Sequence, residues 1–325
     1  MSPSDSYHGQ PVLKQPVWTW EIPCYFYAGG LAGASAGLAY LSESRGNEVL
    51  ARRAWSAAML GIGVSPALLT SDLGRPFRFL NMLRMFKVTS PMSVGSWILT
   101  ASGATTALAT ASVWTGWFPR AGRAARPAAA ALGLPLSTYT AALVANTAVP
   151  VWHDSHRLLP FVFASGAALS AGSAGVIAAP PNHAAPARRL ALVSAALEVA
   201  VKELMERRLA KQGEPYRHGA AARFGRIGQA CIAAGATLLA TRGGRSRGAA
   251  IGAGALLSAG ALSARWSVFK AGFGSAANPA YVVRPQRAGI EAGEARGAAR
   301  RQSRVLNPDP ARGSPATAPV ELFAS

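Results

Sequence analysis

Residues 22–42 read IPCYFYAGGLAGASAGLAYLS and contain no Asp, Glu, Lys or Arg. A helix that crosses a hydrocarbon core of roughly 30 Å needs about 20 mainly apolar residues, and this stretch is long enough. Its small residues, among them Gly29, Gly30, Gly33 and Gly37, suit the close approach of one membrane helix to another. The stretch therefore predicts a transmembrane helix that packs through small side chains.

Comparable runs follow along the rest of the chain. The further charge-free runs are 54–71, 88–119, 127–151 and 158–181. The segments that carry charge or are shorter are 189–209, 227–241 and 248–264. Five charge-free runs separated by polar residues, Pro and Gly are poorly explained as buried helices of a soluble protein. The pattern predicts an all-α, polytopic membrane bundle of about eight transmembrane helices.

The expected organisation has three parts. The membrane domain spans residues 17–283, after an amino-terminal extension of residues 1–16. Residues 284–325 are rich in Arg, Pro, Gly and Ala with little apolar periodicity. Such a composition cannot bury enough apolar surface to fold, so this basic tail is predicted to be disordered.

The charge balance is strongly basic, with 33 Lys and Arg against 14 Asp and Glu in 325 residues. Such an excess can indicate nucleic acid, anionic lipid or membrane loops. Here the arginines lie between the apolar runs and in the tail, which argues against nucleic-acid binding. Basic residues are slightly more numerous on the side of the two termini, so the positive-inside rule favours cytoplasmic termini in the plasma membrane.

The connection at residues 71–92, SDLGRPFRFLNMLRMFKVTSPM, differs from the other loops. Its aromatic and aliphatic residues alternate with basic ones at near-helical spacing, which predicts an amphipathic helix in the membrane interface. The helix is either a lipid-headgroup anchor or a docking surface for a partner subunit. Asp72, Arg75 and Arg78 are the candidate docking residues.

Residues 72–84, DLGRPFRFLNMLR, together with 89–97, TSPMSVGSW, resemble the signature of the NrfD/PsrC family of membrane subunits. Three further stretches are similar to that family, and the resemblance covers roughly residues 17–287. The similar stretches are 25–37, 137–152 and 265–287.

The resemblance implies a membrane subunit without a redox cofactor of its own, neither haem nor iron–sulfur cluster. Such a subunit exchanges electrons between the membrane quinone pool and a peripheral, ferredoxin-like iron–sulfur subunit. That partner in turn serves a molybdopterin or multihaem catalytic subunit, which sets the substrate; substrates in the family include polysulfide, nitrite and formate.

The histidines agree with this expectation on one point. None of them lies at the centre of a predicted span, where paired axial ligands of a transmembrane haem would be needed. His153 and His156 are three residues apart at a predicted membrane interface. They are more simply interpreted as polar loop residues than as a pair of metal ligands. We therefore expect no metal site and a diffusible electron carrier, and a quinone needs no protein ligation.

A quinone site needs an apolar cleft, hydrogen-bond partners and a route for protons. Tyr139 and Asn146 lie seven residues apart and hence on one helix face. The resemblance places Tyr139 at the position of the family's quinone-pocket tyrosine, although an interhelical hydrogen bond is an equal alternative. Asn146 fits an interhelical contact better.

Trp20 and Glu21 stand where the resemblance places polar side chains of the family's quinone pocket. That pocket often includes a His, which is missing here. Glu21 is either a proton acceptor or an interfacial carboxylate.

Glu198 is the acid placed deepest in a predicted span. An unpaired carboxylate at the bilayer centre costs roughly 2.5–3.5 kcal/mol, so such residues are usually neutralised or functional. Glu198 is thus a candidate proton relay, and Lys202 at i+4 is the alternative, a partner that simply neutralises it.

Two further functions remain open at this level. A passive anchor of an oxidoreductase complex would have the same sequence pattern without touching quinone. A small-solute transporter would show broken helices and clustered midplane polar residues in two related halves, and no internal repeat is evident.

Overall fold

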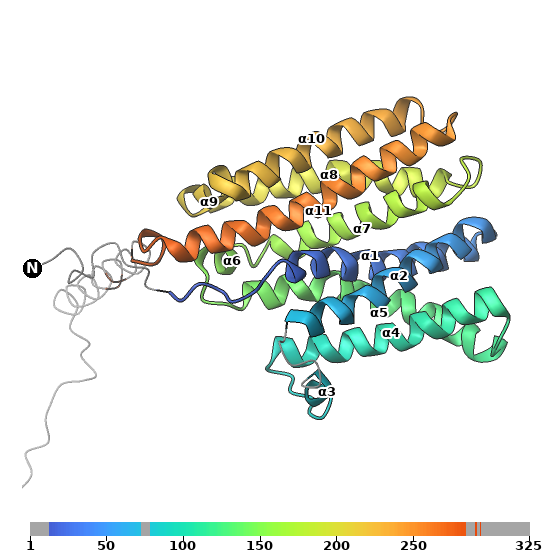
Figure 1. The fold of residues 1–325 in the computed structure, drawn as a ribbon, viewed down its shortest axis with the longest axis horizontal. Helices are drawn as coiled ribbons and strands as arrows, with labels where there is room; N and C mark the ends of the chain where they lie inside the picture. The colour runs from blue at the N-terminus through green and yellow to red at the C-terminus, as the bar shows by residue number, and fades with distance from the viewer. Residues whose placement is uncertain (1–12, 73–78, 284–289, 291–292, 294–325) are drawn as a thin grey trace, which may run out of the picture. The chain divides into compact units, whose positions relative to one another are not determined.

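The computed structural model describes residues 13–72, 79–283, 290 and 293, and within these ranges the regular structure is entirely helical (Figure 1). Eight of the described helices have 20 to 31 residues and run alternately up and down. They are α1 (Glu21–Ser44), α2 (Glu48–Asp72), α4 (Pro91–Thr115), α5 (Pro119–Ala145), α7 (Leu159–Ala178), α8 (Ala185–Leu209), α10 (Gly219–Thr241) and α11 (Arg247–Ala277). Short elements at the connections are α3 (Phe79–Met82), α6 (Pro150–Asp154), η3 (Ala210–Gly213) and α9 (Glu214–Arg217).

Helices α1 and α7 lie in the middle of the bundle (Figure 1). Helix α1 packs against α2, α5 and α7, and α4 packs on α5 at one side. On the other side α7 packs against α8 and α11, and α10 lies along α11. We call the end of the bundle where α1 begins and α2 ends the near end, and the opposite end the far end.

The bundle lies in a first compact unit, Met1–Pro279, and a second unit comprises Ala280–Ser325. In the second unit residues 280–283, 290 and 293 are described and are helical. The disorder expected for residues 284–325 otherwise concerns residues outside the described part of the chain.

The fold class expected from the sequence is confirmed as all-α, and the long helices follow the expected segments in order. Several boundaries differ: α5 begins at Pro119, eight residues before the run 127–151, and α10 begins at Gly219 instead of residue 227. The run 127–151 is interrupted, because α5 ends at Ala145 and Pro150 begins α6. Segment 248–264 is only part of α11, which continues through Arg265 to Ala277, so Arg265 lies within the helix and not beyond its end.

By length and composition, three of the described helices are apolar enough to cross a membrane: α2, α5 and α7. Helix α1 lacks charge from residue 22 to 42, but its Gly, Ala, Ser and Tyr contribute little hydropathy. Helix α8 carries Glu and Lys within its length. The long helices thus differ in how apolar they are. The most polar of them, α8, packs against α7, one of the most apolar.

The connection between α2 and α4 contains less helix than its sequence pattern predicts. Of its described residues, only Phe79–Met82 are helical, as α3. The hydroxyl of Ser93 holds the following turn, because it accepts from the Lys87 N–H at 3.1 Å and donates to the Met85 carbonyl at 3.0 Å. Arg75 and Arg78 lie outside the described residues.

Glycines set the closest helix contacts. Gly33 of α1 and Gly133 of α5 face each other, and a Cβ on either one would overlap the carbonyl oxygen of the other. A Cβ on Gly61 of α2 would lie 2.7 Å from the Ala28 carbonyl oxygen of α1. Without side chains at these points the backbones come into direct contact, which is how membrane helices gain packing energy.

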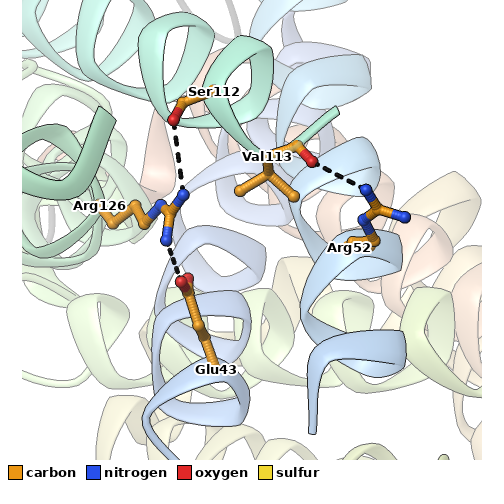
Figure 2. Close-up of polar contacts among 5 residues, drawn as sticks. All are labelled: Glu43, Arg52, Ser112, Val113 and Arg126. Carbon is orange, nitrogen blue, oxygen red and sulfur yellow. Dashed lines mark hydrogen bonds and ion pairs between the residues drawn. The ribbon is translucent and has the colours of Figure 1, made fainter. Parts of the chain in front are cut away.

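A polar cluster joins four helices at the far end (Figure 2). Arg126 of α5 forms an ion pair with Glu43 of α1, and its other terminal nitrogen lies 3.5 Å from the Ser112 hydroxyl of α4. Arg52 of α2 donates to the Val113 carbonyl at 3.1 Å. The cluster borders a cavity of about 310 Å³. These contacts add to the apolar packing of Trp55, Ala109 and Ala125 in joining α1, α2, α4 and α5.

The ion pair yields a stability prediction. Replacing Arg126 with Ala leaves the half-buried Glu43 carboxylate without its partner, and an unsatisfied buried polar group costs about 1–3 kcal/mol. We expect Arg126→Ala to lower the thermal unfolding midpoint of the purified protein in detergent. Arg123→Ala, which removes an exposed arginine of the same helix, serves as the control. Equal midpoints for the two variants would contradict a structural role for the pair.

Candidate functional site

A small apolar cavity of about 90 Å³ lies at the near end, between the segment that precedes α1 and helices α1, α2, α4 and α5. Polar side chains interrupt its largely apolar wall at Tyr25, Tyr139, Asp72 and Ser96. Its lining comprises Trp18, Ile22, Tyr25, Phe26, Leu69, Asp72, Met82, Met92, Ser96, Tyr139 and Leu143.

The two tyrosines form a pair across the helix interface. The hydroxyl of Tyr25 on α1 is hydrogen-bonded to the hydroxyl of Tyr139 on α5, and either one could be the donor. Tyr25 is almost fully buried, and the Tyr139 ring lies against Gly95 of α4, where any Cβ would overlap it. The two phenols are therefore held by packing and are hydrogen-bonded to each other beside the cavity.

Asp72, the last residue of α2, connects this cavity with the segment before α1. Its Oδ1 accepts from the Thr19 hydroxyl at 2.9 Å and from the Thr19 backbone N–H at 3.4 Å. The same Thr19 hydroxyl also contacts the Glu21 carboxylate. Two carboxylates thus converge on one hydroxyl at the rim of the cavity, where a proton passing in or out would meet acceptors.

Trp18 closes the cavity from the side of α6. Its ring stacks on that of Trp152, with centroids 5.5 Å apart and planes inclined by 26°. Trp152 is fully buried, donates to the Val268 carbonyl at 2.8 Å, and occupies the space that a side chain at Gly272 would need. The segment before α1 is therefore attached to α6 and α11 as well as to α2.

The structure brings together only some of the residues that the sequence singled out. Tyr139 lines the cavity, and Glu21 reaches its rim through Thr19. Trp20 is 58% exposed and does not line the cavity. Asn146 is exposed, directly follows α5 and is not among the residues that line the cavity.

Two lining residues acquire a role that sequence reasoning missed. The sequence contained a feature that could have identified Tyr25. It lies within a charge-free run, one turn after Glu21, and its hydroxyl is costly to bury. Asp72, expected as a docking residue, is also part of the cavity wall. Its partner Thr19 had no signal at all, since the contact joins residues 53 positions apart.

Glu198 lies in a second polar site, between α7, α8 and α11. It is 1% exposed, and its Oε2 accepts from the Ser165 hydroxyl at 2.5 Å. Its Oε1 has no hydrogen-bond partner among the described residues. Gly166 leaves room for this group, because a Cβ there would come within 3.1 Å of the carboxylate.

The Arg265 guanidinium of α11 lies against the same glycine and is also 1% exposed. It donates to the Phe163 carbonyl at 2.8 Å and covers the Phe163 ring at 4.2 Å from its centroid. No ion pair within 4.0 Å joins Arg265 to Glu198, but the two charges interact through space. Phe163 in turn packs edge-on against Phe26 of the cavity wall, with centroids 5.4 Å apart.

Lys202 does not pair with Glu198, contrary to the alternative drawn from their spacing. Its ammonium group instead binds the Glu206 carboxylate at 2.7 Å, one turn nearer the near end. It also lies 5.8 Å from the ring centre of Tyr216 on α9. Burial raises the pKa of the Tyr216 phenol, and the neighbouring Glu206 raises it further. Polar groups therefore follow α8 from Glu198 to the near end.

A family model described as polysulfide reductase, of the NrfD type, matches residues 6–278. Because this match covers well over half of the chain, the protein belongs to the NrfD/polysulfide reductase family, which confirms the resemblance noted in the sequence. It is accordingly an integral membrane protein and the membrane subunit of a respiratory oxidoreductase complex. No curated protein gives a significant match.

The buried charges near Gly166 yield a prediction. Arg265→Met removes the cation that offsets Glu198, and we expect a lower unfolding midpoint in detergent. Glu198→Gln combined with Arg265→Met should recover part of this loss, since neighbouring groups show coupling free energies of about 0.5–3 kcal/mol. The measurement is thermal unfolding of the wild type, both single variants and the double variant. Strictly additive effects would show that the two groups do not interact.

Proposed function

We propose that this protein exchanges electrons between the membrane quinone pool and a peripheral, ferredoxin-like iron–sulfur subunit, with quinone bound at the near-end cavity. The observation that carries the proposal is the Tyr25–Tyr139 phenol pair beside Asp72 in a largely apolar wall. In this proposal all eight long helices cross the plasma membrane with cytoplasmic termini, and the chain itself holds no redox cofactor or metal.

The cavity wall offers the groups that quinone chemistry requires. Oxidation of a quinol releases two electrons and two protons. The Tyr139 hydroxyl donates to a quinone oxygen or accepts from a quinol hydroxyl, with Tyr25 supplying or taking the shared proton. The Asp72 carboxylate accepts a proton at the rim and passes it toward Thr19 and Glu21. In the reducing direction each proton moves the opposite way.

The partner subunit is proposed to dock at the near end. Asp72 leads directly into residues 73–78, which carry the expected docking residues Arg75 and Arg78. Electrons that leave a quinol at Asp72 and Tyr139 would then have a short path to an iron–sulfur cluster at that face. A molybdopterin or multihaem subunit beyond it would carry out the terminal reaction.

The cavity volume favours one alternative, a passive anchor that binds no quinone. At about 90 Å³ the cavity is smaller than the roughly 300–1,000 Å³ of typical small-molecule sites. Entry of a quinone ring requires side chains to move aside. Met82 and Met92 of the wall are suited to this, because methionine is unbranched and adaptable.

Glu198 is proposed as a proton relay behind this site. Its Oε1 is free to take up a proton, while Ser165 holds Oε2. Lys202 and Glu206 continue along α8 toward the near end, a rise of about 12 Å from Glu198 to Glu206 at 1.5 Å per residue. There a cavity of about 350 Å³ is bordered by Asp154 and His156 among others, and it would serve as the exit of the route.

The quinone site is tested with the intact complex purified in mild detergent. We expect Tyr139→Phe to lower quinol oxidation about 3- to 10-fold, because it removes one hydrogen bond to the quinone and no packing. Tyr40→Phe, at an exposed tyrosine near the other end of α1, is the matched control and should match the wild type. A complex that contains no quinone and is indifferent to Tyr139→Phe would establish the passive anchor instead.

The relay is tested by pH–rate profiles of the same complex. Gln at position 198 keeps the contact with Ser165 but exchanges no proton, so we expect Glu198→Gln to lower turnover at least tenfold and to flatten its pH dependence. The profile of Glu203→Gln, which changes a more exposed acid of the same helix, provides the comparison. Unchanged turnover with an unchanged profile in Glu198→Gln would remove Glu198 from the mechanism.

A further inference from the structure

A larger groove of about 530 Å³ runs toward the far end between α1, α5, α7 and α8, separate from the quinone cavity. Small side chains form its floor, and exposed Leu41, Leu134 and Val193 form its edges. The exposed edges place its opening on the lipid-facing surface of the bundle. Its volume lies within the usual range of small-molecule sites.

The groove originates at the glycine contact between α1 and α5. Gly33 is in direct contact with Gly133, whereas a Cβ on Gly37, one turn further along the same face, would meet no atom within 4 Å. The two helices therefore touch at one level and leave open space at the next. The open space therefore results from the way α1 and α5 diverge, and not only from the absence of a side chain at Gly37.

Short of its far end, the described wall of the groove offers no free side-chain hydrogen-bond donor. The hydroxyls of Ser42, Ser137 and Thr138 each donate to the carbonyl four residues earlier in their own helix, at 2.6, 2.8 and 3.1 Å. A quinone ring would find no partner for its oxygens here. A hydrocarbon chain needs none.

The far end of the groove is basic. Arg45, which ends α1, and Arg189, in the second turn of α8, both line it and are exposed. Among the described residues that line the groove there is no Asp or Glu. Helix α8 also begins here without a side-chain cap, so its first N–H groups add to the positive potential. An anionic group at this end would therefore be stabilised from two helices.

We propose that the groove binds an anionic phospholipid of the far-end leaflet, with one acyl chain along the groove and the phosphate between Arg45 and Arg189. From Gly33 to Arg45, α1 rises about 18 Å at 1.5 Å per residue. One leaflet contributes about half of a hydrocarbon core of roughly 30 Å, so chain and groove match in length. The headgroup then lies at the membrane surface, where basic pockets between helices recognise anionic lipid.

The headgroup contact is tested by native mass spectrometry of the full-length protein in detergent with added phosphatidylglycerol or phosphatidylcholine. We expect the wild type to retain phosphatidylglycerol in preference to phosphatidylcholine. Arg45→Gln combined with Arg189→Gln should reduce this preference about 10- to 30-fold, from about 1 kcal/mol for each arginine near the surface. Arg53→Gln, at an exposed arginine of α2 that does not line the groove, should keep it.

The acyl-chain contact is tested by filling the groove. Leu at position 37 projects into open space, so we expect Gly37→Leu to keep the wild-type unfolding midpoint and to lose both lipids. Gly63→Leu, at an exposed position of α2 that is equally open, is the matched control and should retain lipid. Equal retention of both lipids by the wild type, lipid retained in Gly37→Leu, or release of the lipid by added quinone would each overturn the proposal. The measurement detects the mass of bound lipid. Its result therefore tests the lipid proposal independently of quinol turnover.

Discussion

The direct contact between Gly33 of α1 and Gly133 of α5 is the constraint on which the arrangement at both ends of the bundle depends. Two turns toward the near end from Gly33, α1 presents Tyr25, and α5 presents Tyr139 six residues after Gly133. One turn the other way, the helices leave the groove at Gly37. A side chain at either glycine would separate the two backbones, and the Tyr25 and Tyr139 hydroxyls could no longer form their hydrogen bond.

The second organising feature is the way the bundle holds buried charge. Arg265 and Glu198 both lie against Gly166, yet each takes its hydrogen bonds from α7, through Phe163 and Ser165. Phe163 also packs against Phe26 of the near-end cavity. The charged site and the phenol pair are therefore connected by two aromatic rings. A change of charge at Glu198 would alter the electrostatic potential at the cavity, because buried residues and not solvent lie between the two sites.

Much of this architecture could be predicted from the sequence, because absence of charge over 20 residues is a local property. Tyr139 and Glu198 stood out for the same reason, as polar residues within apolar runs. The partners of these residues could not be predicted. Tyr25 and Tyr139 meet from positions 114 residues apart, and only the helix crossing brings them together.

Spacing along a single helix was a weaker guide. Lys202 is correctly placed to reach Glu198 at i+4, but Glu206 at the same distance on its other side binds it instead. The apolar segment 248–264 stops just before Arg265, yet α11 continues for twelve residues beyond that arginine. In both cases packing against α7 and α10, which no local pattern encodes, decided the outcome.

The cluster around Glu43 and Arg126 has a consequence for how the bundle meets its membrane. Glu43 Oε2, Arg126 Nε and Trp55 Nε1 are buried without a hydrogen-bond partner in the part of the chain that the structure describes, and all three residues border one cavity. Polar atoms in such a position require water. A hydrated far end shortens the apolar length of α1, α2, α4 and α5, which at 24 to 27 residues are longer than a hydrocarbon core of roughly 30 Å. The bundle can then match the bilayer by admitting water at one end instead of by tilting.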